Sequence, residues 1–490
     1  SSEIKSLLPD LPSRPEVNSK ALQEVFTFWG PLGPDSLFAG VASVRPGEMV
    51  SIERGRVRRW QWWDWTFPTD GNFLGARNLG PSIDDLAETL RELLLDATRL
   101  RLRADVPVGA YLSGGLDSSA VAALALEAGK EDLRTFSVTF DDPGLDERVF
   151  QAQVQRHLQT QHTEVHCGGA AIADLMPRVI ERTEQPILRT APAPLALLSG
   201  HVRDKGYKVV LTGEGADEVL GGYDLFKEAK IRRFWAVQPE SVSRPRLLER
   251  LYPWLGLGER MGLPYLKQFF GQGLDQPEAW DFSHQLRWQM GDWLRGFLLP
   301  DHRGESAEAV AAPLRASLPA DFGRWHPINR AQYLELRTLL PGYLLCSQGD
   351  RMLMANGVEG RFPYLDHRVI EFASKLHPRL KMKGLNEKYL LKRAVARLLP
   401  ADILKRPKQP YRAPDAAAFG VSGAMPAYVE DHLSPASVRA AGLFDPHRVE
   451  LLLRKLSRGR QTSARENMAF VGILSTQLWH RRFIQEQSIA

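Results

Sequence analysis

The segment Ser113-Gly-Gly-Leu-Asp-Ser-Ser119 combines residue types that suit a bound pyrophosphate. An apolar run at 106–112 predicts a strand before it, and the apolar residues of 116–128 predict a helix after it. A turn between a strand and a helix points backbone N–H groups and the helix N-terminus at one place, which favours an anion there. The two glycines let the backbone approach that anion, and the three serines add hydroxyl donors.

Asp117 changes the ligand expected at this turn, because a carboxylate by itself repels a phosphate. A Mg²⁺ ion between the two groups reverses the sign of that interaction. The turn has neither the G-x-x-x-x-G-K-[ST] pattern nor the G-x-G-x-x-G pattern of other phosphate-binding loops. We therefore expect a site for magnesium-bound pyrophosphate, with an ordinary glycine-rich turn as the alternative.

A second segment, 211–223, is both acidic and rich in glycine, and it also follows a predicted strand. Its carboxylates Glu214, Asp217 and Glu218 share one face if a helix begins there. Like charges that close repel each other unless a cation or a cationic substrate group lies between them. Asp217 and Asp117 together are a predicted pair of Mg²⁺ ligands. An acidic first helical turn that favours the helix dipole explains the acids as well, but not the flanking glycines.

Two further groups of charges accompany these segments. Asp350 with Arg351, and Glu359 with Arg361, are predicted ion pairs at a buried boundary, where structural pairing competes with substrate contact. Residues 405–411, Lys-Arg-Pro-Lys-Gln-Pro-Tyr, suit a clamp that neutralises a leaving pyrophosphate. A solvated basic loop is the alternative for this segment.

The elements that must position these residues alternate between strand and helix. Strands are predicted at 106–111, 134–140, 162–166 and 207–212, with helices at 116–128, 146–157 and 170–182. Strands separated by helices imply an α/β fold with a parallel sheet whose two faces are covered. Ligands of such sheets bind at the carboxyl ends of the strands, where Asp141 and the two glycine-rich segments converge.

The first 70 residues read differently from the rest. A hairpin of 49–53 with 56–60 is predicted between two turn sequences. We expect the tryptophans of 60–65 to cover a seam between domains. A stretch rich in Gly, Pro and Asn at 67–81 is a predicted linker, so the predicted domains are 1–70 and 71–490.

The remaining sequence is predicted to be helical. Ser82 followed by Asp85 is typical of a helix N-terminus, and leucines follow on one helical face. Residues 225–330 predict irregular helices without a recognisable function, and residues 331–490 are mostly helical.

Composition limits the class of protein. The 490 residues are 43% hydrophobic and 25% charged, which is ordinary for a globular protein. No apolar stretch approaches the length of a membrane span, and no signal peptide is visible. Cys167 and Cys346 form no C-x-x-C motif, which argues against disulfides and zinc and favours a cytoplasmic location. The net charge of +5 does not favour nucleic acid, and basic clusters such as 56–59 and 99–103 are expected to be solvated.

These motifs, in their order and spacing, resemble the synthetase part of glutamine-dependent asparagine synthetases of the B type. The resemblance runs from Ser82 to about Ile484 and rests on 113–119, 136–140 with 146–147, 213–223, 349–366 and 406–408. It implies a Rossmann-like ATP pyrophosphatase (PP-loop) domain with a helical C-terminal part. It also implies ATP and Mg²⁺ as cofactors, and a β-containing remnant of an Ntn-type glutaminase domain at 1–70.

The resemblance further implies a role for each matching residue. The phosphates with Mg²⁺ would be held by Ser113, Gly114, Gly115, Asp117, Ser118 and Ser119, and the adenosine by Leu112, Val138, Thr212 and Gly213. Glu214 would be the carboxylate needed to form the acyl-adenylate, Lys408 would contact phosphate or the intermediate, and Asp117 would complete the catalytic set. Arg189 would help to bind the acid substrate, and Asp217 and Glu218 would bind metal or the ammonium group of the substrate, with Asp117 and Asp217 as metal ligands. The stretch around Arg189, 186–194, departs from the commonest pattern of these synthetases.

The start of the chain resembles only the closing stretch of a glutaminase domain, at 2–8 and 40–47. An N-terminal Cys nucleophile, an Arg-Gly-Pro-Asp motif and an Asn-Gly-Glu-Ile-Tyr-Asn motif are not in this sequence. We therefore expect no glutaminase activity from this chain alone, and expect glutamine to supply ammonia in a longer protein.

The predicted reaction is the ATP-dependent amidation of a carboxylate. With aspartate as the acid, a β-aspartyl-AMP intermediate gives asparagine, AMP and pyrophosphate. The alternatives are amidation of another acid (a secondary metabolite or a peptide), a tRNA-modifying PP-loop ATPase, and a non-catalytic nucleotide-binding relative. The expected partners are small-molecule substrates, the acid and ammonia or glutamine. Neither nucleic acid nor membrane is expected, and a homodimer is the oligomeric state considered.

Overall fold

The computed structural model describes residues 1–69, 71–75, 80–421, 423–458 and 462–485. Its central element is a five-stranded parallel sheet with the order β5-β4-β3-β6-β7. The strands are β3 (Val108–Tyr111), β4 (Arg134–Thr139), β5 (Gln161–His166), β6 (Val209–Leu211) and β7 (Glu359–Arg361). The chain adds β4 and β5 on one side of β3, and β6 and β7 on the other. The carboxyl ends of β3 and β6 therefore flank the crevice in which such sheets bind ligands.

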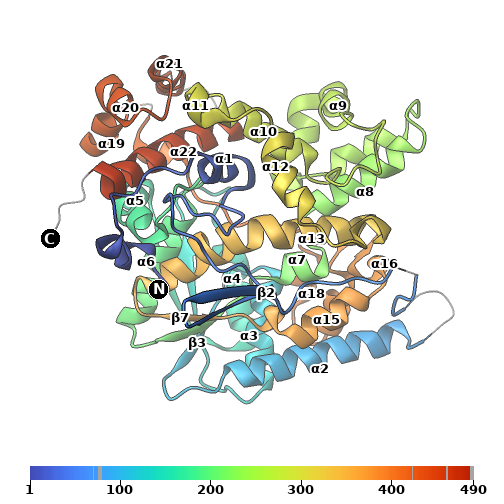
Figure 1. Ribbon diagram of the computed structural model, residues 1–490. Helices are drawn as coiled ribbons and strands as arrows, with labels where there is room; N and C mark the ends of the chain where they lie inside the picture. Colours follow the sequence, from blue (N-terminus) through green and yellow to red (C-terminus); the bar gives the residue numbers. More distant parts are fainter. Residues whose placement is uncertain (70, 76–79, 422, 459–461, 486–490) are drawn as a thin grey trace.

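Helices cover both faces of this sheet, as the alternation of buried side chains requires. Val209 and Leu211 of β6 join the core under α2 (Ile83–Arg101) and α3 (Leu116–Glu127). Val210 points the other way, into the core under α6 (Pro192–Asp204) and α14 (Arg351–Met354). Figure 1 shows α2 running below the sheet, with α15 (His367–Lys375) beside it.

A second large core lies beyond the sheet. It joins α1 (Ser19–Phe28) to α5 (Gly169–Thr183) and to α22 (Ala464–His480), which is buried along most of its length. Phe38 contacts Trp479 of α22 with ring centroids 5.1 Å apart. Figure 1 shows α1 close beneath α22. The first 70 residues thus share a core with the C-terminal helices, and the predicted domain boundary stays a prediction.

A group of helices between β6 and β7 in the chain lies at the upper right of Figure 1. It includes α8 (Asp224–Ala236), the 3₁₀ turn η4 (Pro253–Leu255), α9 (Leu257–Phe270) and α10 (Gln285–Arg295). These helices have a small core of their own, to which Trp235, Phe270 and Leu286 contribute. No function was predicted for this region from the sequence.

The remaining elements complete the helical layers. The helices are α4 (Arg148–Leu158), α7 (Ala216–Leu220), α11 (Pro300–Arg303), α12 (Ala307–Ala316), α13 (Pro327–Leu339), α16 (Pro378–Lys381), α17 (Tyr389–Ala394), α18 (Ala401–Lys405), α19 (Ala427–His432), α20 (Pro435–Ala441) and α21 (Pro446–Ser457). A π-helix spans Leu340–Asp350, and two hairpins are formed by β1 (Glu48–Glu53) with β2 (Arg56–Gln61) and by β8 (Met382–Lys383) with β9 (Asn386–Glu387).

Most predicted elements are confirmed. All four predicted strands exist, as do the hairpin at the start of the chain and the capping box of Ser82 with Asp85. The short strand β7 was missed, because Glu-Gly-Arg carries a charge at each end and shows no apolar run. Arg361 of β7 does pair with Glu359 (2.8 Å) as predicted, whereas Arg351 pairs across the chain with Glu184 (2.8 Å).

Two predictions about the first 81 residues need correction. Trp60 and Trp62 cover no seam, since 43% and 63% of their surfaces are exposed. Trp63 and Trp65 do pack against buried residues. In the predicted linker 67–81, residues 70 and 76–79 lie outside the described residues, but Phe67 is buried against Trp325. An aromatic ring at that position anchors the segment to the helical core.

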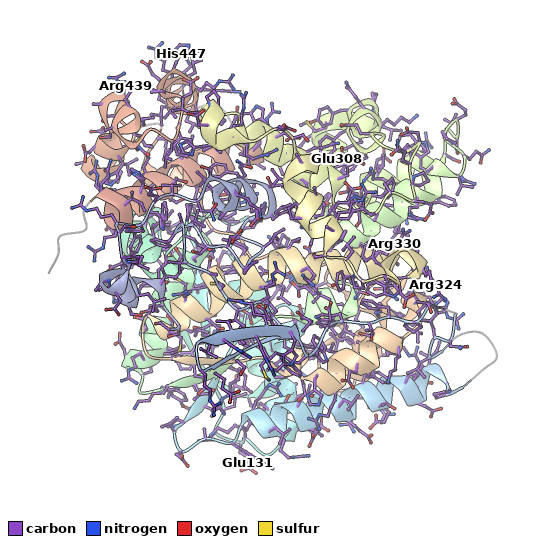
Figure 2. All side chains as sticks on the ribbon, viewed as in Figure 1. Glu131, Glu308, Arg324, Arg330, Arg439 and His447 are labelled. Carbon is purple, nitrogen blue, oxygen red and sulfur yellow. The ribbon has the colours of Figure 1, made fainter. Side chains whose placement is uncertain are left out.

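The surface carries charges of both signs. Glu131, Glu308, Arg324, Arg439 and His447 are exposed and lie around the edge of the molecule in Figure 2. Within the described ranges, no helix combines the length and the apolar character needed to cross a membrane.

Candidate active site

The turn after β3 has the geometry expected of an anion site. Gly115 is the N-cap of α3 and no side chain caps this helix, so its first N–H groups stay open. Ser118 Oγ accepts a hydrogen bond from Ser113 N (3.1 Å) and lies 3.0 Å from Ser113 Oγ, which holds the two hydroxyls side by side. Gly114 has a φ of 74°, and a Cβ there would come within 2.7 Å of Phe150. Ser119 is fully buried behind the turn and lines neither cavity described below.

Two aspartates and two lysines meet beside this turn. Lys388 Nζ lies 2.5 Å from both Asp117 Oδ2 and Asp217 Oδ1. Lys408 Nζ lies 2.6 Å from Asp217 Oδ2 and 3.7 Å from Asp117 Oδ2. Burial opposes the charged form of Lys408, but the carboxylates of Asp217 and Asp117 outweigh it and raise the pKa of this ammonium. Likewise, burial would raise the pKa of Asp217, and the two ammonium groups lower it on balance.

The two aspartates fit a magnesium ion. They come from different strand ends yet are close enough to share the same two cations. Asp117 Oδ1 is buried and has no hydrogen-bond partner among the described residues, so one ligand atom is free. Mg²⁺ is commonly held by one or two carboxylates together with substrate phosphates, which matches this pair. A complete cage of three or more His, Cys, Asp or Glu side chains does not occur in the described part of the chain.

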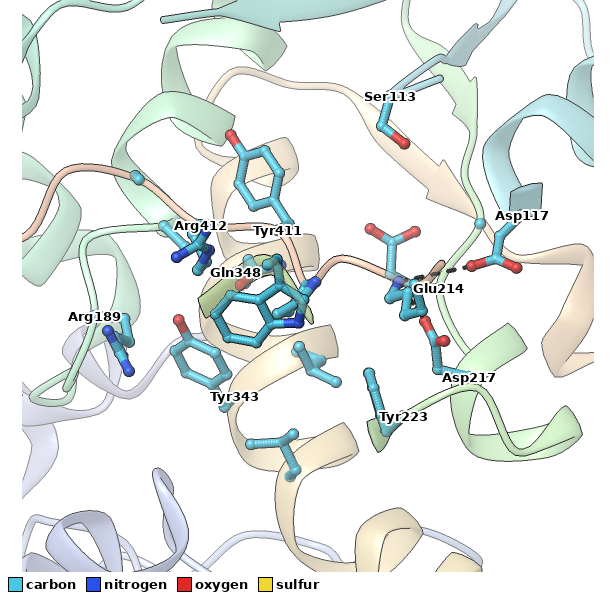
Figure 3. A pocket seen from close by; sticks show the side chains of 18 of the residues that line it. Ser113, Asp117, Arg189, Glu214, Asp217, Tyr223, Tyr343, Gln348, Tyr411 and Arg412 are labelled. Carbon is cyan, nitrogen blue, oxygen red and sulfur yellow. Dashed lines mark ion pairs between the residues drawn. The ribbon is translucent and has the colours of Figure 1, made fainter. Parts of the chain in front are cut away.

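Glu214 lies between this cluster and the rest of the cavity (Figure 3). It was predicted to share a helix face with Asp217, but Gly215, with a φ of 89°, ends the preceding loop and α7 begins only at Ala216. Glu214 therefore stands before the helix. Burial raises the pKa of its carboxyl, and its Oε2 atom has no hydrogen-bond partner among the described residues. A buried carboxyl with a free oxygen is suited to accept or donate a proton at a reacting group.

Glu218 faces Tyr223, whose hydroxyl donates a 2.7 Å hydrogen bond to Oε1. Burial, reinforced by the charge of Asp217, raises the pKa of Glu218 to about 8.

Between the ordinary carboxyl pKa and this pKa of about 8 for Glu218, the folded protein thus holds one proton more than the unfolded chain. The free energy of unfolding should therefore fall as pH rises through that window. Glu218→Gln should flatten this decline, as measured by urea denaturation at a series of pH values; an equally steep decline in the variant would contradict the assignment.

Gly222 makes the approach of Lys388 to Asp217 possible. A Cβ at this position would overlap both Asp217 Oδ1 and Lys388 Cε. Gly222→Ala should therefore separate the ion pair, lower the free energy of unfolding by about 2 kcal/mol and reduce activity. Gly323→Ala is the matched control, because a Cβ at Gly323 meets nothing within 4 Å. Equal stability of the two variants in urea denaturation would argue against this packing role.

The cluster opens into one large cavity of about 560 Å³. Leu112, Val138, Thr212 and Gly213, the predicted adenosine contacts, all line it. Arg189 and Arg412 lie across the cavity from Ser113 and Asp117 in Figure 3. A smaller cavity of about 80 Å³ lies beside the turn and is lined by four cations, Lys388, Lys392, Arg406 and Lys408.

Arg189, the predicted acid-binding residue, has a partner within the protein. Its Nη1 atom lies 2.7 Å from Asp415 Oδ2, and its guanidinium is 5.6 Å from the ring of Trp29. Arg412 lies 4.4 Å from the ring of Trp254. This end of the cavity therefore has two guanidinium groups against one carboxylate, an excess of one positive charge.

Sequence reasoning missed Lys388, a cation of the site, whereas Arg406 belongs to the basic segment 405–411 that the sequence had identified. Lys388 is only 2% exposed and precedes α17 in a left-handed conformation (φ 50°). Arg406 donates a hydrogen bond to Gly114 O (3.1 Å) and pairs with Glu147, so it stabilises the turn that follows β3. The signal available for Lys388 was a single lysine after a short hairpin, which is common on protein surfaces. Only the fold shows that it reaches two aspartates from different strands.

The chain is similar to known proteins over most of its length. The family model described as Asparagine synthase matches residues 89–481. Amidase chry2 of Gibberella zeae is 27% identical over 440 residues, which cover 84% of this chain and 64% of that protein. Asparagine synthetase (glutamine-hydrolyzing) 1 of Bacillus subtilis is 27% identical over 416 residues, 81% of this chain and 60% of that protein. A putative asparagine synthetase of Mycobacterium bovis is 29% identical over 486 residues, 97% of this chain and 69% of that protein.

The chain thus spans less than two thirds of the amidase and of the Bacillus synthetase, at 64% and 60% of their lengths. The family match, in contrast, extends from α2 to the end of α22 and includes every strand of the sheet. On this match, the chain belongs to the asparagine synthase family, a family of carbon–nitrogen ligases.

Proposed function

We propose that this chain catalyses the ATP-dependent amidation of a carboxylate. The observation that carries the proposal is the cluster of Asp117, Asp217, Lys388 and Lys408 beside the open N-terminus of α3. It offers two metal-binding carboxylates and two cations where a pyrophosphate would leave. The cavity that continues from it has room for a nucleoside and an acid.

In the first step, an oxygen of the acid attacks the α-phosphorus of ATP, and the bond to the pyrophosphate oxygen breaks. The open N–H groups of α3, with Lys388 and Lys408, bind the departing pyrophosphate. Mg²⁺, held by Asp117 and Asp217, supplies further positive charge to the phosphates when bound. The product of this step is an acyl-adenylate.

In the second step, ammonia attacks the acyl carbon, and AMP leaves with the electrons of the C–O bond. Attack leaves an extra proton on nitrogen, which a nearby base must accept. Glu214 lines the cavity beside Lys408, and its buried carboxyl suits the transfer of that proton. Glutamine is the proposed source of ammonia in a longer protein.

Aspartate is the first acid to consider, because two of the relatives compared here carry the name asparagine synthetase. Amidation of another acid is the second candidate. The apolar wall of the cavity, which includes Trp254, Phe270 and Leu286, favours it. A relative that carries the name amidase also supports this second candidate.

The test is to incubate the chain with MgATP and ammonium chloride, with and without aspartate, and to follow pyrophosphate, AMP and asparagine. Asparagine formed only with aspartate would establish both the reaction and the substrate. Pyrophosphate released with another acid but not with aspartate would keep the reaction and change the substrate. A protein that binds MgATP but releases no pyrophosphate with any acid would refute the proposal.

A further inference from the structure

One part of the large cavity is lined by none of the residues predicted to hold ATP. Its wall is formed by the helices inserted between β6 and β7, and we call it the annex. The annex is lined by Leu225, Tyr252, Trp254, Leu255, Phe270 and Leu286. Leu225, Phe270 and Leu286 are each less than 10% exposed, so the apolar surface that they present belongs to the interior. Water in such a space is readily displaced by an apolar group.

Apart from Arg412, which lies 4.4 Å from the ring of Trp254, the charged groups around the annex already have partners within the protein. Glu228 accepts a hydrogen bond from Tyr252 (2.7 Å) and lies 3.6 Å from Arg232. Arg287 donates to Glu335 Oε1 (2.9 Å). Glu335 Oε2 also lies 2.9 Å from a ring nitrogen of His284, and Asp224 pairs with Lys227 at 2.9 Å. Each of these three carboxylates is therefore balanced by a cation of the protein.

Four of the other carboxylates that line the cavity are engaged in the same way, whereas Glu214 and Glu218 have no cation as a partner among the described residues. Asp117 and Asp217 face two lysines, Glu147 pairs with Arg406, and Asp415 pairs with Arg189. Polar hydrogen-bonding capacity remains at Trp254, whose buried Nε1 has no partner in the described part of the chain.

On the basis of the proposed amidation, we propose that the acid substrate has a bulky apolar, aromatic-sized body, and that this body lies in the annex. Its reacting carboxylate then lies beside Glu214 and Lys408, and an acceptor on the body can take a hydrogen bond from Trp254. Leu255, on η4 at the edge of the annex, is a residue that determines this specificity.

ATP–pyrophosphate exchange with matched acids tests this inference. We expect kcat/KM for 3-phenylpropanoate to exceed the values for propanoate and aspartate at least about 10-fold each. Propanoate lacks the ring, and aspartate is the small polar acid. Comparable or faster exchange with aspartate would overturn the inference and leave the proposed reaction intact. No exchange with any acid, by a protein that binds MgATP, would instead reject the proposed reaction and the inference with it.

A variant that fills the annex provides a second test. Leu255→Trp should reduce exchange with 3-phenylpropanoate at least about 10-fold and leave exchange with propanoate unchanged. Val242→Trp adds the same side chain at a position in the inserted region that is 76% exposed, and it should change neither value. Equal losses with both acids in the Leu255 variant would show a general structural effect and contradict a role in specificity.

Discussion

Asp117→Asn should reduce ATP–pyrophosphate exchange about 1,000-fold while the protein stays folded. The amide has nearly the shape of the carboxylate but no charge, so it weakens the magnesium site and its pairing with Lys388. Lys388 keeps Asp217 as a partner at 2.5 Å, which limits the loss of stability. Exchange measured at saturating MgATP, with unfolding followed in urea, separates the two effects.

Asp141→Asn is the control for this experiment. Asp141 also follows a strand of the sheet, but its side chain is 74% exposed and contacts His166. This variant should exchange at the rate of the unaltered protein. If the Asp117 variant retained full exchange, the turn would not be the pyrophosphate site and the proposed function would lose its main support.

Lys388→Met should have the second largest effect. Removing the ammonium leaves Asp117 and Asp217 facing each other with only Lys408 between them. Removing one partner of a buried ion pair leaves the other charge uncompensated, so we expect the free energy of unfolding to fall by about 3 kcal/mol. Pyrophosphate exchange should fall with it, since the leaving group loses a cation.

Magnesium should reverse part of this loss of stability. With Lys388 gone, a divalent cation can occupy the space between the two carboxylates, and a ligand that binds only the folded state stabilises it. Urea denaturation of the variant with and without Mg²⁺ measures this recovery directly. Lys383→Met, an exposed lysine of β8, should show neither the loss nor the recovery. A variant as unstable with Mg²⁺ as without it would exclude these carboxylates as a metal site.

The sequence alone determined the strands that carry the site and the turn that follows β3. Local patterns suffice for these, because a buried strand needs an apolar run and an open helix N-terminus needs small residues before it. The same patterns identified Asp117, Glu214 and Asp217, which the structure brings to one crevice. They did not reveal β7, a strand of three residues whose pairing with β6 comes from a distant segment.

Only the tertiary structure decided how the charges of the site are balanced. Lys388 follows Asp117 by 271 residues, and no local pattern distinguishes it from a solvated lysine. The same holds for Arg351, which pairs with Glu184 across the chain. The annex, too, arises from apolar residues on separate helices that have no common period in the sequence. Ion pairs and cavity walls depend on distances between segments, and the chain sets those distances only when it folds.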